Sequence, residues 1–172
     1  MKILSIILLS DKKPTHVVYD LSHYSFLQRS SIKEFLTFIT QTIVDHAKSG
    51  TTVVEHEEHL VVCLKTNTAL SAVAITDKDY PPRITNAMLR EALSIPTALD
   101  KILEKYQNPQ DIFMRINCQI DETKDLLIIT IDKVLQRGET LEALIEKSDK
   151  LSASSKVFYK KAKQTNSCCS II

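Results

Sequence analysis

Short apolar runs alternate with polar turns through the first half of the chain. Five of the runs are rich in β-branched residues, which is typical of strands. The polar stretch 10–14 between the first two runs predicts an antiparallel hairpin, and the stretch 66–68 between the last two predicts another. The predicted strands cover residues 2–9, 15–22, 51–57, 59–65 and 69–76.

Apolar residues at helical spacing occur between and after these strands. They extend over 29–50, where Ser30 or Ser31 can cap the start of a helix. A second helix with prolines at its start is predicted over 80–93, and a shorter one follows it. Strands in a meander with helices on the faces predict an α+β domain over residues 1–106.

The second half of the chain follows a different period. Over residues 107–166 the apolar side chains recur at alternating spacings of three and four, which is typical of a coiled coil. A helix over the apolar repeat itself, residues 113–165, would reach about 80 Å, so it is expected to pack against partner helices rather than lie on a small domain. The apolar seam includes Phe113, Ile116, Ile120, Leu127, Val134, Leu141, Leu144, Leu151 and Phe158.

One seam position, Arg137, carries a charge. A guanidinium in a helical core is costly unless several acceptors meet it, so a simple dimer would be destabilised. Partner helices that bring amide oxygens to the same layer would satisfy it, and buried polar groups of this kind fix register and partner number. The small residues Ser148, Ser155 and Ala162 leave room for bulk from partners. The segment is therefore predicted to join a mixed bundle.

Composition narrows the function classes. The net charge of +1 gives no electrostatic reason to expect nucleic acid. The chain has two glycines, which cannot build a phosphate-cradling loop and so argue against a small GTPase. No apolar run approaches the length of a membrane span. The chain is expected to be a cytosolic protein and not an enzyme, without a small-molecule substrate or cofactor.

The stretch 55–59 gathers three carboxylates and two imidazoles. His56 and His59 are three apart in β-prone sequence, so on one strand they would point to opposite faces and could not chelate one ion. The expected structure is a solvated strand edge or turn. No spacing of Cys and His elsewhere in the sequence suggests a metal site.

The chain ends in two adjacent cysteines, Cys168 and Cys169. Cys169 and the three residues after it fit the four-residue prenylation pattern. One lipid chain gives only reversible membrane binding, whereas two hold firmly. The basic residues Lys160, Lys161 and Lys163 would add attraction to an anionic leaflet. The tail is therefore predicted to be a lipid handle.

The sequence around Arg137, KVLQRGETLEALIEKSDKLSASSKVFYKKAK, resembles the arginine-type SNARE motif of the synaptobrevin class. The stretches FLQRSSIKEFLTFITQ and DYPPRITNAMLREAL are similar to a longin domain, and YQNPQD and NSCCSII resemble the lipid-anchored, Ykt-type longin branch. The resemblance implies a profilin-like longin domain over 1–106, with a five-stranded antiparallel sheet and helices on both faces. An R-SNARE coiled-coil helix over 107–166 and a lipidated tail over 167–172 would follow.

The same resemblance implies partners and residue roles. Arg137 would form an ionic layer with glutamines from three Q-SNARE helices (Qa, Qb and Qc), and the four-helix bundle would dock and fuse vesicles in ER–Golgi transport. Cys169 would carry a prenyl group and Cys168 a palmitoyl group, with prenylation of Cys168 as an alternative. Phe38 would dock the SNARE segment onto the longin domain as a brake, and ordinary core packing of Phe38 is an equal alternative.

The implied locations are the cytoplasm and the cytoplasmic face of Golgi, endosomal or vacuolar membranes, between which the protein would cycle by reversible lipidation. The SNARE-disassembly machinery is a further implied partner. A prenylated coiled-coil trafficking adapter that does not drive fusion is the alternative function. It would explain every feature above except Arg137.

Overall fold

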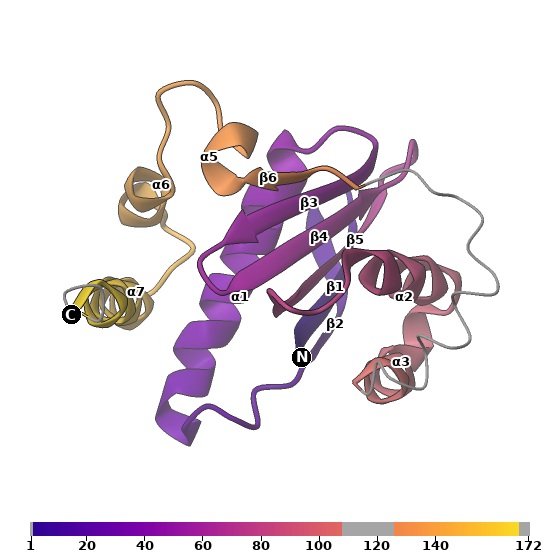
Figure 1. Ribbon diagram of the computed structural model, residues 1–172, viewed down its shortest axis with the longest axis horizontal. Coiled ribbons are helices and arrows are strands. Elements are labelled where there is room, and N and C mark those ends of the chain that lie inside the picture. The colour runs from indigo at the N-terminus through magenta and orange to yellow at the C-terminus, as the bar shows by residue number, and fades with distance from the viewer. Residues whose placement is uncertain (1, 108–125, 169–172) are drawn as a thin grey trace.

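A mixed sheet of six strands forms the centre of the molecule, in the order β2-β1-β5-β4-β3-β6 (Figure 1). This computed structural model describes residues 2–107 and 126–168. The first five strands pair antiparallel, as the apolar runs predict. They are β1 (Ile3–Ser10), β2 (Lys13–Tyr19), β3 (Gly50–His56), β4 (His59–Lys65) and β5 (Leu70–Asp77).

Helices cover both faces of the sheet (Figure 1). Side chains alternate along the strands between two core clusters, so that in β1 Ile7 and Leu9 face one side while Ile6 and Leu8 face the other. The predicted α+β longin-type fold is therefore confirmed. The helix on one face is α1 (Phe26–His46), and those on the other are α2 (Pro82–Ser94) and α3 (Leu99–Tyr106), joined by the short 3-10 helix Pro96–Ala98.

Helix α1 begins earlier than predicted. Its N-cap is Ser25 rather than Ser30 or Ser31. The backbone N–H of Ser25 donates to the side-chain oxygen of Gln28 at 3.3 Å, and the Ser25 hydroxyl donates to the same oxygen at 2.9 Å. A Ser followed three residues later by Gln is a capping-box sequence, and in the structure this pair forms the start of α1.

The C-terminal segment, defined here as residues 126–168, does not form the single long helix that the heptads predict. Its first element, β6 (Ile128–Thr130), pairs parallel with the edge strand β3. The rest folds beside α1 as separate helices (Figure 1). These are α5 (Ile131–Val134), α6 (Leu141–Lys147) and α7 (Ala153–Cys168). The prediction is wrong for this conformation because the apolar seam finds a partner within the same chain, the outer face of α1.

Candidate functional site

The candidate site is the interface between α1 and the C-terminal segment. Apolar side chains of the segment belong to the same core cluster as Leu36, Phe38 and Ile39 of α1. Burial is nearly complete, since Leu141 is 2% exposed and Ile145 is 1% exposed. The segment is therefore docked as part of the fold and does not merely rest on the surface. Its buried apolar members are Ile131, Leu135, Leu141, Ile145, Leu151 and Tyr159.

The central contact joins α1 to α7. The rings of Phe35 and Tyr159 stack with centroids 5.1 Å apart and an angle of 27° between planes. Such aromatic pairs contribute about 0.5–1.5 kcal/mol beyond the area they bury. The Tyr159 side chain is buried, and this burial raises the pKa of its hydroxyl.

A carboxylate of α1 anchors the start of α7. Oε2 of Glu34 accepts a hydrogen bond from the hydroxyl of Ser155 at 2.7 Å and another from the backbone N–H of Ser152 at 3.0 Å. These bonds, the one from Ser155 first, hold the pKa of the Glu34 carboxyl below its ordinary value. The hydroxyl of Ser152 also accepts from the backbone N–H of Ser155 at 3.3 Å and so caps α7. Glu34 thus binds two residues at the N-terminus of α7 and holds that end of the helix against α1.

Two further polar contacts border the apolar interface. Lys150 lies in the connection between α6 and α7, and its Nζ donates a hydrogen bond to Oε1 of Gln41 in α1 at 3.0 Å. Nε2 of His46, at the end of α1, lies 3.6 Å from Oε2 of Glu139. These contacts hold the connections at both ends of α6 against the same helix, so α6 is fixed in place as well as buried.

Arg137 lies exposed on the turn between α5 and α6. The next residue, Gly138, has φ +90°, and the backbone N–H of Glu139 donates to the carbonyl of Gln136 at 2.9 Å to close the turn. Thr140 then caps α6 by accepting from the backbone N–H of Ala143 at 3.2 Å. The predicted helix is thus interrupted at its one charged seam position, where glycine permits the left-handed conformation.

The other predicted seam residues divide by position. Leu127, before the turn, is 79% exposed. Val134, Leu144 and Phe158 are partly buried against the core cluster, whereas Leu141 and Leu151 are buried within it. Phe113, Ile116 and Ile120 lie outside the described residues. Most of the seam after Arg137 is therefore covered by the domain.

Phe38 is buried, at 8% exposure, in the core cluster that also contains the docked segment. It also lines a cavity of about 280 Å³ over α1. Phe38 therefore belongs to the core that the docked segment shares, and its role in docking stays a prediction. The cavity is lined by Tyr19, Lys33, Glu34, Thr37, Phe38, Gln41 and Lys150.

The predicted turn at residues 55–59 is present, but the geometry of its histidines differs from the prediction. His56 ends β3 and His59 begins β4, and the two are directly opposed across the hairpin. Opposed residues of an antiparallel pair lie on the same face, so the prediction of opposite faces was wrong because the residues belong to two strands. Burial lowers the pKa of both imidazoles. Within residues 2–107 and 126–168, no cluster of His, Cys, Asp and Glu could hold a metal ion.

One of the two predicted lipid sites lies at the end of α7. Cys168 is the last residue of this helix, and Cys169 falls outside the described part of the chain. Of the helices that the structure describes, none combines the length and the apolar character needed to cross a bilayer.

Sequence reasoning missed the contacts that hold the segment closed. Phe35 and Tyr159 were not singled out from the sequence, and Ser155 was predicted only to leave room for bulk from partners. Their pairing depends on α7 lying across α1, which no local pattern specifies. The signals that could have indicated a broken helix are Gly138 and the capping residue Thr140.

Comparisons with known proteins show the family to which this chain belongs. A family model described as Synaptobrevin matches residues 113–169. The chain is 40% identical to "Synaptobrevin homolog ykt6" of Schizosaccharomyces pombe, over 99% of this chain and 100% of that protein. It is 39% identical to "VAMP-like protein YKT61" of Arabidopsis thaliana, over 89% of this chain and 87% of that protein. The chain therefore belongs to the synaptobrevin family, as a Ykt-type longin-domain R-SNARE of vesicle trafficking, in a family that does not act by enzymatic catalysis.

Proposed function

We propose that the C-terminal segment drives membrane fusion by joining three Q-SNARE helices, one each of the Qa, Qb and Qc groups, in a four-helix bundle. The observation that carries this proposal is the double use of the seam. Leu141 and Leu151, which the bundle would bury, are buried against the longin domain. One face of a helix cannot enter two interfaces at once. The longin domain therefore acts as a brake that competes with the Q-SNARE helices.

Arg137 sets the register of the bundle. Its guanidinium is exposed to water in the docked conformation. On assembly it would lose that water, and the loss is tolerable only where several acceptors meet the guanidinium. Amide oxygens of three glutamines, one from each partner helix, supply such acceptors. A misaligned bundle would leave the charge unpaired.

Two lipids anchor the protein in this proposal. A prenyl group on Cys169 gives reversible membrane sampling, and a palmitoyl group on Cys168 makes attachment firm. Zippering toward the lipidated end draws the opposed bilayers together, and the SNARE-disassembly machinery resets the complex. The expected locations are the cytoplasm and the cytoplasmic face of Golgi, endosomal or vacuolar membranes.

Circular dichroism of the full chain mixed with the three Q-SNARE helices tests the bundle. We expect more helix in the mixture than in the sum of its parts, because the broken segment becomes continuous. Arg137→Leu should lower the melting temperature of the complex. Arg90→Leu, which removes an exposed arginine on α2, serves as the control and should not lower it. A mixture that equals the sum of its parts would instead favour a prenylated trafficking adapter.

The brake has a separate test at Phe38. Phe38→Glu places a carboxylate in the cluster shared by α1 and the segment, so it should release the segment and raise the membrane-bound fraction in cells. Hydrodynamic radius and cell fractionation report these two effects. If compactness and the cytosolic fraction both stay as in the wild type, Phe38 does not hold the brake.

A further inference from the structure

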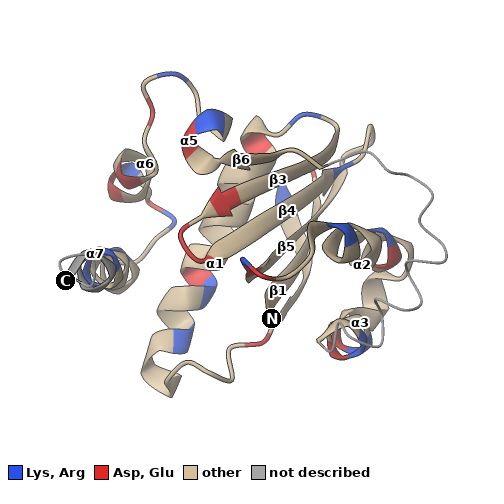
Figure 2. Ribbon diagram, viewed as in Figure 1, with Lys and Arg blue, Asp and Glu red and all other residues tan. Residues whose placement is uncertain are grey.

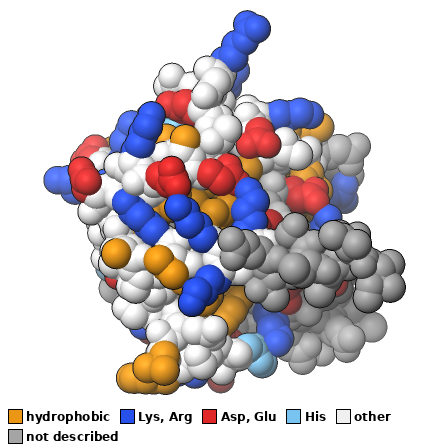
Figure 3. All heavy atoms as spheres, turned by 90° about the vertical axis from the view of Figure 1, so that its left-hand side faces the viewer, with side chains coloured by type: hydrophobic (Ala, Val, Ile, Leu, Met, Phe, Trp, Pro, Cys, Tyr) orange, Lys and Arg blue, Asp and Glu red, His pale blue; other side chains and the backbone are white. Residues whose placement is uncertain are grey.

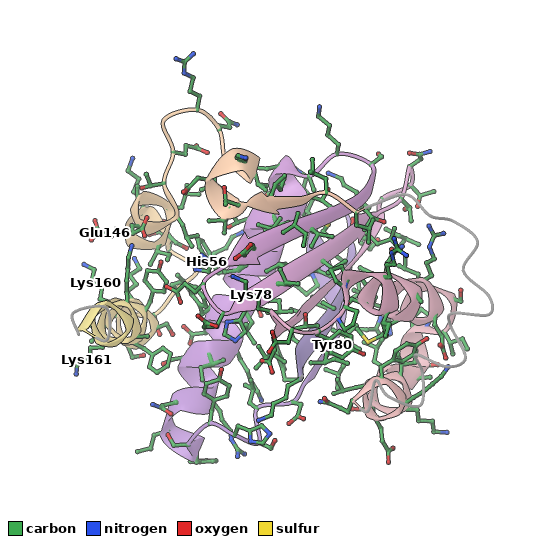
Figure 4. The ribbon with its side chains drawn as sticks, in the orientation of Figure 1. His56, Lys78, Tyr80, Glu146, Lys160 and Lys161 are labelled. Carbon is green, nitrogen blue, oxygen red and sulfur yellow. The ribbon has the colours of Figure 1, made fainter. Side chains whose placement is uncertain are left out.

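Carboxylates of α6 and lysines of α7 form a set of ion pairs within the docked segment. Nζ of Lys160 lies 2.7 Å from Oε1 of Glu146. Lys163 pairs with Glu142 one helical turn further along. In Figure 4, Lys160 lies on the side of α7 toward Glu146, and Lys161 lies on another side of the helix. We call Glu142, Glu146, Lys160 and Lys163 the α6–α7 clasp.

The clasp can exist only while the segment is broken between α6 and α7. In one continuous helix Glu142 and Lys163 would be about 32 Å apart, and Glu146 and Lys160 about 21 Å apart, at 1.5 Å per residue. Both distances exceed the screening length of about 8 Å at physiological salt. The four charges therefore favour the docked conformation over the straight helix. An interaction that separates these carboxylates from the lysines therefore favours the straight helix.

The clasp is open to competition from solution. The side chains of Lys160 and Glu146 are 59% and 61% exposed, and those of Lys163 and Glu142 are 52% and 47% exposed. Hydrogen bonds from Lys160 and Lys163 lower the pKa of the carboxyls of Glu146 and Glu142, so both carboxylates are ionised at neutral pH. Exposed pairs of this kind are weak and are screened by salt. A surface that presents many negative charges can replace two carboxylates.

The position of α7 indicates which surface this is. Acidic positions gather on α6 and basic positions on α7 (Figure 2). On this side of the molecule, Lys and Arg side chains lie close together with carboxylates among them (Figure 3). The chain continues from α7 directly into the cysteine pair. A lipid attached there, as in the proposed function, would bring the lysines of α7 to the surface of the bilayer.

We propose that the α6–α7 clasp senses membranes: an anionic bilayer displaces Glu142 and Glu146 from Lys160 and Lys163, and this displacement unlocks α6 from α7. In solution the carboxylates neutralise the lysines and stabilise the docked segment. At an anionic leaflet the lipid headgroups take their place, and the carboxylates are repelled by the same surface. The seam would thus be released at a membrane, where Q-SNARE helices are met, rather than in solution.

The test uses the full, unlipidated chain, so that lipid anchoring does not obscure the electrostatic effect. Amide hydrogen exchange is followed in α6 and α7 with vesicles of phosphatidylcholine alone or of an equimolar mixture with phosphatidylserine. Exchange in both helices should accelerate only with phosphatidylserine, and at high salt the rates with and without these vesicles should become equal. Amides of β1 and β5 serve as an internal check that the domain stays folded.

Substitutions separate the two halves of the clasp. Glu142→Gln with Glu146→Gln frees two lysines, so vesicle affinity should rise by about fivefold for each lysine, and α6–α7 should exchange faster without vesicles. Lys160→Gln with Lys163→Gln should also speed exchange without vesicles, but it should weaken binding to phosphatidylserine. Lys101→Gln removes an exposed lysine of α3, in the opposite layer, and is the control. It should change neither the vesicle affinity nor the exchange rate of α6 and α7.

Three results would overturn the inference. They are equal exchange with both vesicle types, acceleration of exchange by soluble inorganic phosphate to the same extent as by vesicles, and intact vesicle binding after loss of both lysines. Bundle formation in the absence of vesicles tests the proposed function separately. If the segment opens on phosphatidylserine but never pairs with Q-SNARE helices, the clasp proposal stands and the SNARE bundle is rejected. If it pairs with Q-SNARE helices but does not open on phosphatidylserine, the bundle stands and the clasp proposal is rejected.

Discussion

Replacing Gly138 with alanine tests whether the turn beside Arg137 is the hinge between the docked segment and a continuous helix. The residue has φ +90°, a conformation that side-chain-bearing residues adopt only under strain. A Cβ built on it meets no atom within 4 Å, so the substitution introduces no clash. The effect of the substitution on stability must therefore come from the backbone alone. Its magnitude can be estimated from the conformational preferences of glycine and alanine.

Two free-energy contributions of the Gly138→Ala substitution both favour the straight helix over the docked segment. A left-handed conformation costs an alanine roughly 1–2 kcal/mol, which destabilises the docked turn. Within a helix interior, alanine is favoured over glycine by about 1 kcal/mol, which stabilises the straight segment in a bundle. The docked segment should therefore open about 5- to 30-fold more often by itself, at 1.4 kcal/mol per factor of ten. Together, the two contributions should shift the equilibrium between the docked segment and the bundle toward the bundle by about 30- to 140-fold.

Amide hydrogen exchange measures the first contribution, because local opening exposes the amides of α6 and α7 while the sheet stays folded. Competition between docking and Q-SNARE helices measures the second. Gly50→Ala is the matched control, since Gly50 also has a positive φ, +110°, and an added Cβ there also meets nothing within 4 Å. It lies at the start of β3, away from the hinge.

Gly138→Ala should accelerate exchange in α6 and α7, whereas Gly50→Ala should lower the stability of the whole domain without that selective effect. Unchanged protection of α6 and α7 in Gly138→Ala would refute the hinge. So would an equal loss of α6–α7 protection in both variants, because the effect would then follow from general destabilisation rather than from the position of the turn.

Three further substitutions or conditions test the interface. Ile145→Ala removes a side chain that is 1% exposed and should weaken docking by about 2–5 kcal/mol, seen as exchange in α6 and α7 that rises while β1 is unaffected. Glu34→Gln keeps the shape of the α7 anchor but loses its charge, so exchange at the start of α7 should rise by less than in Ile145→Ala. Burial lowers the pKa of His56 and His59 from 6.5, so their contribution to stability is complete above that pH and is lost as the pH falls through the lowered values. The melting temperature should therefore fall on acidification, and less so in His59→Gln; an equal fall in that variant would contradict this origin.

The domain could be predicted from the sequence because its signals are local. Strands such as β4 and β5 are short β-branched runs bounded by polar turns, and the hairpins between neighbours need no distant information. The predicted cap was misplaced by five or six residues because Ser30 and Ser31 compete with Ser25, and Ser31 is also followed three residues later by an acidic residue, Glu34, so the capping-box pattern alone does not choose between them. An error of this kind does not change the fold.

The docked segment could not be predicted, for a different reason. The heptads from Leu127 to Phe158 specify an apolar seam, but not which surface covers it. The edge pairing of β6 with β3 and the stacking of Tyr159 on Phe35 join residues far apart in the chain. Hydrophobic patterning is satisfied equally by α1 and by partner helices, so the pattern alone does not choose between them.

In the proposed function the seam must fit two interfaces, and Ser155 is a residue that could fit both. In the docked segment it is 1% exposed, and its hydroxyl donates to Glu34 at 2.7 Å. A larger apolar residue there would lose that bond and would fill the space that a mixed bundle needs for its partners. A small hydroxyl satisfies both packings, although it is the best residue for neither. Docking built from such residues has limited stability, and the proposed function requires that limit, because Q-SNARE helices would have to displace the longin domain.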